Sequence, residues 1–322
     1  MDKISSLIGD ELEKVEVKLI NDLSSDVPLI NKVGGYIIGS GGKRFRPLML
    51  LLVAKYCNYG GEEHIPLACI FEYIHTATLL HDDVLDNAEV RRGNSSVNSV
   101  WGNRTSVLVG DFLISMAFSH LIKIGNLKIM KVVSDAATQM AEGETMQTER
   151  SGDPHLTEEE YITIISNKTA RLIAAACQVG ALLGNSSPQR EDIFKNYGLN
   201  LGIAFQMIDD TLDYISEDKK FGKATCKDLK EGKITLPLIH TLREASAKDR
   251  EAIIRILKSN SLDKQNLYLI TELIKEYQGM SYVRKRAKEY INSSMHYVQE
   301  LDSSPIKDAL IATADYVLER KW

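Results

Sequence analysis

The sequence lacks the features that mark several other classes of protein. Its four cysteines are scattered, without CxxC spacing and without accompanying histidines, which argues against a zinc site and indicates reduced thiols. They are Cys57, Cys69, Cys177 and Cys226. The first 23 residues contain no secretory hydrophobic region, and the longest apolar run, Pro47–Ala54, is far too short to span a bilayer. We therefore expect a soluble, cytoplasmic protein without a transmembrane segment.

An excess of positive charge is also absent. Lysine and arginine number 39 against 44 aspartates and glutamates, so the net charge is −5 and gives no overall electrostatic reason to expect nucleic acid as a partner. The chain is 44% hydrophobic and 26% charged, as is usual for soluble globular proteins. Any site for an anionic ligand must therefore be a local basic cluster.

Strand signals are missing, and prolines are few. Each of the seven prolines fits a helix start or a connection between helices. Apolar residues recur with a helical period almost throughout, and no linker or low-complexity segment divides the chain. We therefore predict one all-α domain over residues 1–322. The expected helices lie near 4–22, 28–39, 47–58, 65–88, 95–123, 126–150, 158–184, 189–217, 235–245, 248–257, 264–278, 281–300 and 305–319.

Two aspartate triplets of identical spacing are the most informative feature that is present. They are DDVLD at Asp82–Asp86 and DDTLD at Asp209–Asp213, and both lie in apolar stretches with helical spacing. The first and last aspartates of each triplet lie within about 40° of each other on one helix face, one turn apart. Gln206 lies on the same side as the second pair. Each helix therefore carries a stripe of carboxylates.

These stripes predict a magnesium site. If they face each other across a helical bundle, their negative charge is prohibitive without cations. Hard oxygen ligands on facing helices suit Mg²⁺, which takes one or two carboxylates and completes its shell with water and substrate phosphate. The alternative is that each triplet is a solvated helix face. Two triplets with the same spacing in apolar surroundings favour the metal site.

A basic turn precedes the helix expected at Pro47. In GGKRFRP (Gly41–Pro47), the glycines allow backbone N–H groups to approach an anion, and the helix N-terminus adds partial positive charge. Lys43, Arg44 and Arg46 add formal charge. The segment is therefore a candidate diphosphate cradle. The alternative is a turn with solvated basic side chains.

Two arginines, Arg91 and Arg92, follow the first triplet directly. The planar guanidinium group suits bidentate contacts with phosphate. The alternative is that they stabilise the C-terminal end of the helix by charge.

Other polar residues occur in helical or loop segments near these motifs. His75 lies seven residues before the first aspartate, nearly in line with it on one helix face, although a lone helical histidine is more often simply packed. Lys168 and Thr169 fall in an apolar helix, where an unpaired ammonium group would be costly unless an anion meets it. Lys223 and Lys233, which flank the loop after the second triplet, are candidates for clamping a bound phosphate, with ordinary surface lysines as the alternative. Glu142 and Glu144 are candidates for lining the same cavity, and no role is assigned to them.

Together these motifs resemble those of the trans-isoprenyl diphosphate synthases, also called polyprenyl synthetases. The resemblance covers nearly the whole chain and is strongest to long-chain members. It implies a bundle of antiparallel helices around a deep central cavity, the isoprenoid synthase type, and usually a homodimer. The matching segments are GGKRFRP (41–47), EYIHTATLLHDDVLDNAEVRRG (72–93), GDF (110–112), KTA (168–170), FQMIDDTLDY (205–214), FGK (221–223) and EGKITLP (231–237).

The resemblance also implies residue roles in a Mg²⁺-dependent prenyl transfer, with about three ions per site once substrate is bound. The metal ligands would be Asp82 and Asp86 on one wall and Asp209 opposite, with Asp83, Asp210 and Asp213 nearby. The allylic diphosphate would be held by Arg91, Lys168, Thr169, Gln206 and Lys223. Isopentenyl diphosphate would be held by Lys43, Arg46, His75 and Arg92. The catalytic set would be Asp82, Asp86, Asp209, Lys168 and Arg91.

One residue departs from the family pattern. Relatives usually have glycine where this chain has Cys226, in the loop after FGK, and the departure questions the local loop geometry rather than the chemistry. Alternative functions are a shorter-chain synthase (geranylgeranyl or farnesyl), the catalytic subunit of a heteromeric synthase, or a class I terpene cyclase. A cyclase normally has a different second metal motif and does not need a second diphosphate cradle.

Product length is expected to depend on the helix just before the first triplet. Short-chain members typically have aromatic residues four and five positions before the first aspartate, where this chain has the small residues Thr78 and Ala77. A growing chain would therefore pass this level, and the resemblance implies an octaprenyl product for quinone side chains, with transient membrane contact during its release. Met116 and Phe118 are candidates for the tunnel floor. The alternative is that Ala77 is small because two helices pack closely there.

Overall fold

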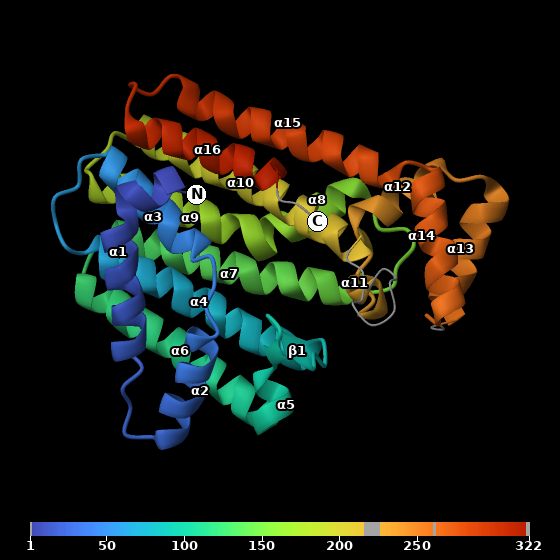
Figure 1. The fold of residues 1–322 in the computed structure, drawn as a ribbon, viewed down its shortest axis with the longest axis horizontal. Helices are drawn as coiled ribbons and strands as arrows, with labels where there is room; N and C mark the ends of the chain where they lie inside the picture. Colours follow the sequence, from blue (N-terminus) through green and yellow to red (C-terminus); the bar gives the residue numbers. More distant parts are fainter. Residues whose placement is uncertain (1, 216–225, 260–261, 320–322) are drawn as a thin grey trace. The chain divides into compact units, whose positions relative to one another are not determined.

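The computed structural model describes residues 2–215, 226–259 and 262–319 (Figure 1). Within these residues the only strands are β1 and β2, of two residues each, so the predicted all-α fold is confirmed. The elements are α1 (Asp2–Asn21), α2 (Pro28–Gly39), α3 (Phe45–Tyr56), α4 (His64–Leu85), β1 (Val90–Arg91), β2 (Asn94–Ser95), α5 (Val97–Trp101), α6 (Asn103–Ile124), α7 (Leu127–Glu149), α8 (Glu158–Ile165), the π-helical turn η1 (Ser166–Ala170), α9 (Arg171–Leu183), α10 (Pro188–Ile215), α11 (Lys227–Lys230), α12 (Leu236–Glu244), α13 (Ala247–Ser259), α14 (Lys264–Glu276), α15 (Gly279–Gln299) and α16 (Pro305–Glu319).

Most predicted helix ends lie within a few residues of the observed ones, but two predicted helices are interrupted. The helix expected over 95–123 is divided at Gly102, whose φ of +82° is incompatible with a continuous right-handed helix and is readily adopted only by glycine. The helix expected over 158–184 contains η1 between α8 and α9. A π-helical turn inside an α-helix often marks a functional position.

The helix expected over 65–88 ends at Leu85, because the chain turns into a short hairpin. β1 and β2 pair antiparallel, with Arg91 opposite Asn94. The two connecting residues, Arg92 and Gly93, have φ values of +53° and +80°. Positive φ at both central positions is the signature of a type I′ turn, which matches the twist of paired strands. The sequence analysis did not predict this hairpin, nor the short helix α11.

The chain forms two compact units. Unit 1 comprises residues 1–137, 175–195 and 303–309, and unit 2 comprises residues 138–174, 196–302 and 310–322. In unit 1, α4 packs against α1, α3 and α6, with Phe71 and Tyr73 of α4 completely buried (Figure 1). The single domain expected from the sequence remains a prediction.

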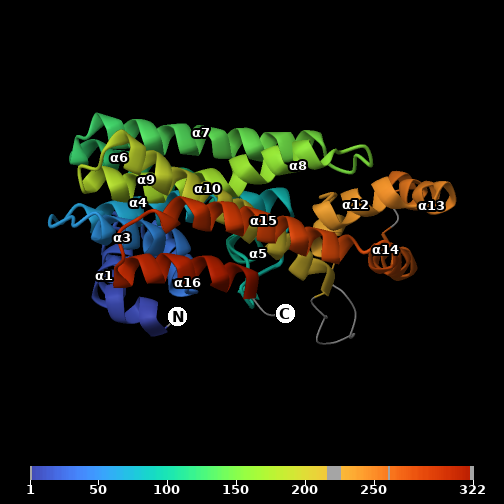
Figure 2. The same ribbon diagram turned by 90° about the horizontal axis from the view of Figure 1, so that it is seen from above.

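Unit 2 is organised around α12. This helix packs against α8, α13, α14 and α15, and α13 and α14 lie side by side (Figure 2). A threonine caps the start of α8: Thr157 Oγ1 accepts the Glu160 backbone N–H, and the Glu160 carboxylate accepts the Thr157 backbone N–H. This reciprocal capping box explains why α8 begins where it does.

α6 has a buried apolar face and an exposed face on which apolar and polar residues are mixed. Its buried residues include Leu113 and Ala117, and Ser106 donates a hydrogen bond to the Leu80 carbonyl of α4 (2.8 Å). On the other side, Leu108 is 57% and Ile122 is 63% exposed. In the described part of the chain, α6 is the helix long and apolar enough to cross a membrane by length and composition, with 28% of its most apolar window buried. Polar residues interrupt the apolar residues of α6, so the sequence shows no long uninterrupted apolar run there.

Candidate functional site

In unit 1, one face of α4 carries polar side chains that stay partly accessible. Partial exposure is retained by His75, Thr78, Asp82 and Asp86, which follow one another at intervals of three or four residues, whereas Ala77 is completely buried. This is one stripe along a helix. The first and last aspartates of the first triplet therefore share an accessible face with His75 and Thr78, as the helical spacing predicts. Ala77 instead contacts the packed interior.

The middle aspartate of this triplet has a different environment. Asp83 is 1% exposed, and its Oδ1 accepts hydrogen bonds from Arg91 Nε (2.8 Å) and Arg91 Nη2 (2.5 Å). The hairpin places Arg91 for this contact and leaves the next side chain, Arg92, to donate to the Gly41 carbonyl of the basic turn. The hairpin thus joins the first triplet to the basic turn through two arginines.

Within the basic turn, Arg44 does not have the role expected for it. Its side chain is only 5% exposed and forms ion pairs with Glu16 and with the buried carboxylate of Glu72 (2.8 Å), and it donates to the Ile38 carbonyl (3.0 Å). Burial alone would lower the pKa of Arg44, but the bonds to Glu16 and Glu72 raise it. Arg44 is therefore a neutralised structural cation rather than part of an anion cradle. The neighbouring Lys43 is exposed, and its role in the cradle stays a prediction.

His75 lies among the arginines of unit 1. Protein surrounds its ring on most sides, and this burial lowers its pKa well below the usual value, as do the positive charges of Arg46, Arg92, Arg91 and Arg44. The imidazole is therefore neutral at pH 7. The neighbouring guanidinium groups make this region electropositive, which is the local basic cluster required for an anionic ligand in a chain with net negative charge.

In unit 2, α10 also has a partly exposed polar face. Gln206, Asp209 and Asp213 keep partial exposure, at intervals of three and four residues. The middle aspartate, Asp210, is 6% exposed. Its carboxylate accepts hydrogen bonds from the Tyr161 hydroxyl (2.6 Å) and from Gln206 Nε2 (2.7 Å). Burial raises the pKa of Asp210 to about 6, and the neighbouring Asp209 charge acts in the same direction.

The network continues to η1. Thr169 Oγ1 donates to Gln206 Oε1 (2.9 Å), so Tyr161, Asp210, Gln206 and Thr169 form one chain of hydrogen bonds. Three members came from the motifs, but Tyr161 was not identified from the sequence. Its only local signal is an aromatic residue in the first turn of an acidic helix start, which is too common to be informative.

Lys168 of η1 is paired. Its ammonium group forms an ion pair with Glu144 and donates to Gln147 Oε1 (2.7 Å). The sequence analysis identified the cost of an unpaired lysine here but assigned no role to Glu144 and did not single out Gln147. The Lys168 ammonium group is therefore held by the carboxylate of Glu144 and the amide of Gln147.

Two glycines allow neighbouring helices to approach η1 closely. A Cβ atom on Gly143 of α7 would lie 2.5 Å from the Lys168 backbone nitrogen, and one on Gly202 of α10 would lie 2.6 Å from Ala170 Cα. Any larger residue would force these helices apart. The position of Lys168 is thus determined by backbone packing as well as by its ion pair.

The last aspartate of the second triplet binds the segment that follows it. The two oxygens of Asp213 accept the backbone N–H groups of Lys227 (3.0 Å) and Asp228 (2.9 Å) at the start of α11. Burial raises the pKa of Asp228 to about 8, with contributions from Asp210 and Asp213. Cys226 is buried with φ +42°, a left-handed conformation in which glycine would be unstrained. The backbone at this position therefore has a conformation that glycine, the residue expected from the family pattern, would adopt without strain.

The remaining candidates have the following positions. Lys233 donates to Glu231 (2.7 Å), and Lys223 lies outside the described residues. Met116 and Phe118 of α6 are partly exposed. Glu142 is exposed.

The carboxylates suit a magnesium site that substrate completes. Among residues 2–215, 226–259 and 262–319, no three His, Cys, Asp or Glu side chains form a preassembled metal cage. Mg²⁺ does not need one, because it usually takes one or two carboxylates and fills its octahedral shell with water and phosphate oxygens. In unit 1, Asp82 on α4 and Asp86 directly after it keep partial exposure, and in unit 2 Asp209 on α10 does so too, so the carboxylate oxygens of each unit have donor chemistry that suits Mg²⁺.

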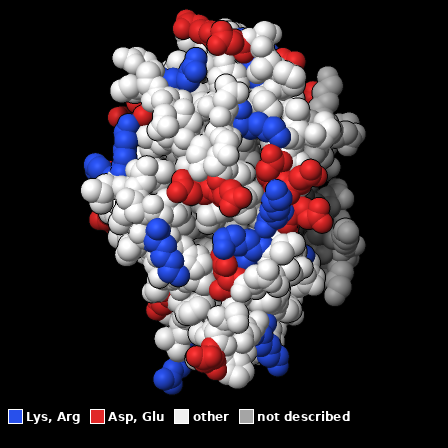
Figure 3. Space-filling model, turned by 90° about the vertical axis from the view of Figure 1, so that its left-hand side faces the viewer, with Lys and Arg blue, Asp and Glu red and all other residues white. Residues whose placement is uncertain are grey.

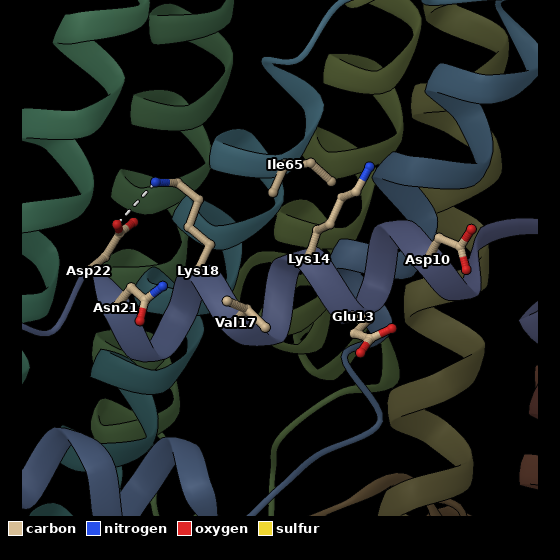
Figure 4. A pocket seen from close by; sticks show the side chains of 8 residues that line it. All are labelled: Asp10, Glu13, Lys14, Val17, Lys18, Asn21, Asp22 and Ile65. Carbon is tan, nitrogen blue, oxygen red and sulfur yellow. Dashed lines mark hydrogen bonds and ion pairs between the residues drawn. The ribbon is translucent and has the colours of Figure 1, made fainter.

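Elsewhere on the surface, a pocket of about 610 Å³ lies along α1, next to Ile65 (Figure 4). Lys18 and Asp22 form an ion pair in it (3.0 Å), and none of its lining residues belongs to the candidate site. On the face drawn in Figure 3, basic and acidic side chains are interspersed, without a continuous patch of one sign. Neither surface offers a competing location for a diphosphate.

Comparisons with known proteins bear on the family of this chain. The sequence profile named Polyprenyl synthetase matches residues 27–274. Octaprenyl diphosphate synthase of Escherichia coli (strain K12) is 38% identical over 320 residues, which is 99% of each chain. The crystal structure of a decaprenyl diphosphate synthase from Rhodobacter capsulatus superposes with a TM-score of 0.94 at 34% identity, covering 99% of this chain and 98% of the other.

A second solved structure bears on the ligands. A polyprenyl synthase from Caulobacter crescentus CB15, complexed with calcium and isoprenyl diphosphate, has a TM-score of 0.94 at 33% identity. The comparison covers 99% of this chain and 97% of the other. That protein thus holds a divalent cation and a prenyl diphosphate in the same fold.

Proposed function

The chain belongs to the polyprenyl synthetase family and is a prenyltransferase, and on that premise we propose that it is a Mg²⁺-dependent trans-polyprenyl diphosphate synthase. It condenses isopentenyl diphosphate head-to-tail onto an allylic diphosphate to make a long chain, octaprenyl by similarity. The observation that carries this proposal is in unit 1, where a stripe of carboxylates along α4 continues to His75, whose pKa is lowered by burial and by the charges of four arginines. Metal-binding and diphosphate-binding groups are thus provided within one packed unit.

Isopentenyl diphosphate is assigned to the basic turn and its neighbours. Lys43 is exposed, Arg46 is partly exposed, and both adjoin the N-terminal part of α3. Arg92 lies against the same turn through its bond to Gly41. His75 supports this assignment because a neutral imidazole can donate a hydrogen bond to a phosphate oxygen without adding a further charge to bury.

The allylic diphosphate is assigned to Arg91, Lys168, Thr169 and Gln206, together with Lys223. Four of these are held by protein partners: Arg91 by Asp83, Lys168 by Glu144, Gln206 by Asp210, and Thr169 by Gln206. Side chains that are held in place lose less conformational entropy when substrate binds. Asp82, Asp86 and Asp209 are assigned as the Mg²⁺ ligands.

The reaction requires no protein nucleophile. The allylic C1–O bond breaks and the electron pair leaves with the diphosphate, whose new charge the arginine and lysine side chains stabilise. Mg²⁺, when bound, supplies further neutralisation of that leaving group. The double bond of isopentenyl diphosphate then attacks the allylic cation, and loss of a proton to the departed diphosphate restores a trans double bond. Lys43 and Arg46 hold the second substrate close enough for this attack.

Chain length is assigned to the accessible face of α4 below the aspartates. Thr78 lies on this face, one turn before Asp82, and its small side chain leaves the path open. Ala77 is small as well, but it is completely buried against the neighbouring packing. Of the two positions expected to control length, Thr78 is therefore the stronger candidate.

We assign the exposed surface of α6 around Leu108 and Ile122 to a homodimer. Both side chains are more than half exposed, on a surface that also carries the exposed polar residues Asp111, Ser115 and Ser119, and protein interfaces combine apolar side chains with polar ones in this way. Light scattering should give twice the mass of one chain, and Ile122→Glu should reduce it to one. Val27→Glu, at an apolar position of similar exposure (50%) on another surface, is the control and should leave the mass unchanged. A monomeric wild type would refute the homodimer.

One assay tests the proposed function. We assign the chain to the cytoplasm. The purified chain is incubated with Mg²⁺, labelled isopentenyl diphosphate and geranyl or farnesyl diphosphate, and the products are sized by chromatography. Long-chain diphosphates are the expected products. If the enzyme contacts a membrane transiently, added lipid vesicles should accelerate release of the product from the enzyme. Products of only 15 or 20 carbons would indicate a shorter-chain synthase. No product without a second subunit would indicate a heteromer, and cyclic hydrocarbon from the allylic substrate alone would indicate a cyclase.

A further inference from the structure

The middle aspartate of each triplet is distinguished from its neighbours by burial. Asp83 is 1% and Asp210 is 6% exposed, whereas Asp82 and Asp209 both keep partial exposure. Adjacent residues on a helix point about 100° apart, so the middle carboxylate turns away from the stripe into the packed interior. Both helices show the same arrangement, although they share no sequence beyond the triplets and their apolar surroundings.

In unit 1 the buried carboxylate holds an arginine. Arg91 donates both Nε–H and Nη2–H to Asp83 Oδ1, and Asn98 Nδ2 donates to the Asp83 backbone carbonyl (3.0 Å). Arg91 sits on a two-residue strand whose turn requires two left-handed residues, so the backbone alone gives it little support. The ion pair with Asp83 therefore determines where the guanidinium group lies.

In unit 2 the buried carboxylate holds an amide and, through it, a hydroxyl. Asp210 accepts from Gln206 Nε2, which fixes the orientation of the amide so that Gln206 Oε1 accepts from Thr169. Tyr161 donates to the other oxygen of Asp210 and keeps the carboxylate in place. Without Asp210 the amide of Gln206 could rotate, and the hydroxyl of Thr169 would lose its fixed acceptor.

We propose that Asp83 and Asp210 are positioning residues, not metal ligands: Asp83 places Arg91, and Asp210 places Gln206 and Thr169, for the allylic diphosphate. This inference rests on the proposed function, because it assumes that those three side chains meet that substrate. It separates the first, outer aspartate of each triplet, Asp82 or Asp209, which serves the metal, from the middle aspartate, which serves the diphosphate-binding side chains.

The test compares neighbouring aspartates within each triplet. Asp83→Asn and Asp210→Asn are measured beside the matched variants Asp82→Asn and Asp209→Asn, which remove the same charge one residue away. For each, we would determine KM for both substrates, the Mg²⁺ concentration that gives half-maximal rate, and binding of an unreactive allylic thiolodiphosphate by calorimetry. Thermal unfolding of the ligand-free, metal-free protein is measured as well.

The middle variants should raise the allylic KM, and the Kd of the thiolodiphosphate, by about tenfold or more, as expected for a lost hydrogen bond to a charged group. Their KM for isopentenyl diphosphate and their half-saturating Mg²⁺ should stay within about twofold of wild type. General destabilisation would reduce the amount of active enzyme without changing one KM selectively. The outer variants should instead raise the Mg²⁺ requirement and reduce kcat.

Unfolding provides the readout that does not depend on turnover. The middle variants should lower Tm by about 2–6 °C because they disrupt buried hydrogen bonds, and the outer variants should lower it less. If Asp210→Asn does not fold, Tyr161→Phe is measured in its place, and if Asp83→Asn does not fold, Asp83→Glu is measured in its place. The former removes one support of Asp210 and should raise the allylic KM about threefold, and the latter keeps the charge and should retain part of the binding.

The proposal is overturned if the middle variants raise the Mg²⁺ requirement as much as the outer ones, or if allylic binding stays within twofold of wild type. Absence of prenyl transfer by the wild type would instead refute the proposed function. In that case an equal Tm for middle and outer variants would still count against the division of the triplets.

Discussion

The two aspartate triplets have the same spacing but different surroundings. In unit 1 the middle carboxylate meets a cation, and other arginines lie close enough to influence His75. In unit 2 the middle carboxylate accepts hydrogen bonds from the neutral donors Tyr161 and Gln206, and its pKa is raised to about 6 by burial. Identical motifs therefore acquire different electrostatic roles from their neighbours.

The cations of the two units differ in the same way. Arg91 and Arg92 lie on a hairpin and are held by a carboxylate and a backbone carbonyl, whereas Lys168 lies in a π-helical turn and is paired with Glu144. Unit 1 supplies rigid guanidinium groups that suit bidentate phosphate contact. In unit 2, Lys168 supplies a point charge that a diphosphate must share with Glu144. We expect substitutions in the two units to have separable effects.

The largest expected effect comes from the outer aspartates. Asp82→Ala and Asp209→Ala should each reduce kcat by about 10²–10³-fold or more, because each removes an oxygen ligand of the metal that stabilises the leaving group. The helical content by circular dichroism should stay at the wild-type level, since both side chains are partly exposed. Near-wild-type turnover with Mg²⁺ in either variant would show that the substituted aspartate is not a metal ligand, and the two triplets would then not share a metal-binding role.

The next effect separates the two substrates by unit. Arg46→Ala in unit 1 should raise mainly the KM for isopentenyl diphosphate, and Lys168→Ala in unit 2 mainly that for the allylic diphosphate. Each lost charged contact should cost about 1.5–3 kcal/mol, or about 10- to 150-fold in KM. Steady-state kinetics with each substrate varied in turn measures both values. Impaired allylic binding with unchanged isopentenyl kinetics in Arg46→Ala would reverse the assignment.

A third prediction uses two adjacent residues of α4 to test which face carries the growing chain. Thr78→Phe should shift products toward farnesyl or geranylgeranyl diphosphate with condensation retained, because an aromatic ring would block the accessible face one turn before Asp82. Ala77→Phe should shorten the products less than Thr78→Phe does. Because Ala77 is completely buried, it should instead lower the unfolding free energy, since overpacking costs about 1–3 kcal/mol. Product sizing and thermal unfolding are measured together. An active Thr78→Phe enzyme with wild-type product length would show that Thr78 does not line the path.

A smaller effect concerns the excess of carboxylates in unit 2. The pKa of Asp228 is raised from its ordinary 3.8 to about 8, so the folded state binds this proton more tightly than the unfolded state. Its favourable contribution is complete below pH 3.8 and is lost as the pH rises through about 8. In metal-free buffer, Asp228→Asn should therefore gain stability relative to wild type between pH 4 and 8. Denaturant unfolding at several pH values measures this difference, and a difference independent of pH would contradict the raised pKa.

The smallest expected effect is at Cys226. Cys226→Gly removes about 1–2 kcal/mol of left-handed strain but also a buried thiol, and glycine gains entropy in the unfolded chain. The unfolding free energy should therefore change by less than about 1 kcal/mol, with activity unchanged. Cys177→Gly, at a buried position inside α9, has no strain to relieve and should cost about 2 kcal/mol or more. Equal losses in the two variants would show that the conformation of Cys226 is not strained.

The sequence was sufficient for features that depend on local periodicity. The helical repeat predicted the all-α fold and most helix ends, and it predicted that Asp82 and Asp86, with Thr78, would share one face of α4, since a repeat of 3.6 residues determines which side chains align. Motif order was also sufficient to identify the family, which the full-length comparisons confirm.

Pairing between distant residues was decided only by the tertiary structure. Arg44 carries the same charge as its neighbour Lys43, but contacts with Glu16 and Glu72, each 28 residues away, neutralise it. Asp210 is held by Tyr161, 49 residues earlier, and Lys168 by Glu144 and Gln147 on another helix. Periodicity gives the direction in which a side chain leaves its own helix, but not which side chain meets it. That depends on how helices pack, and here on close approaches at Gly143 and Gly202 that place η1 between its neighbours.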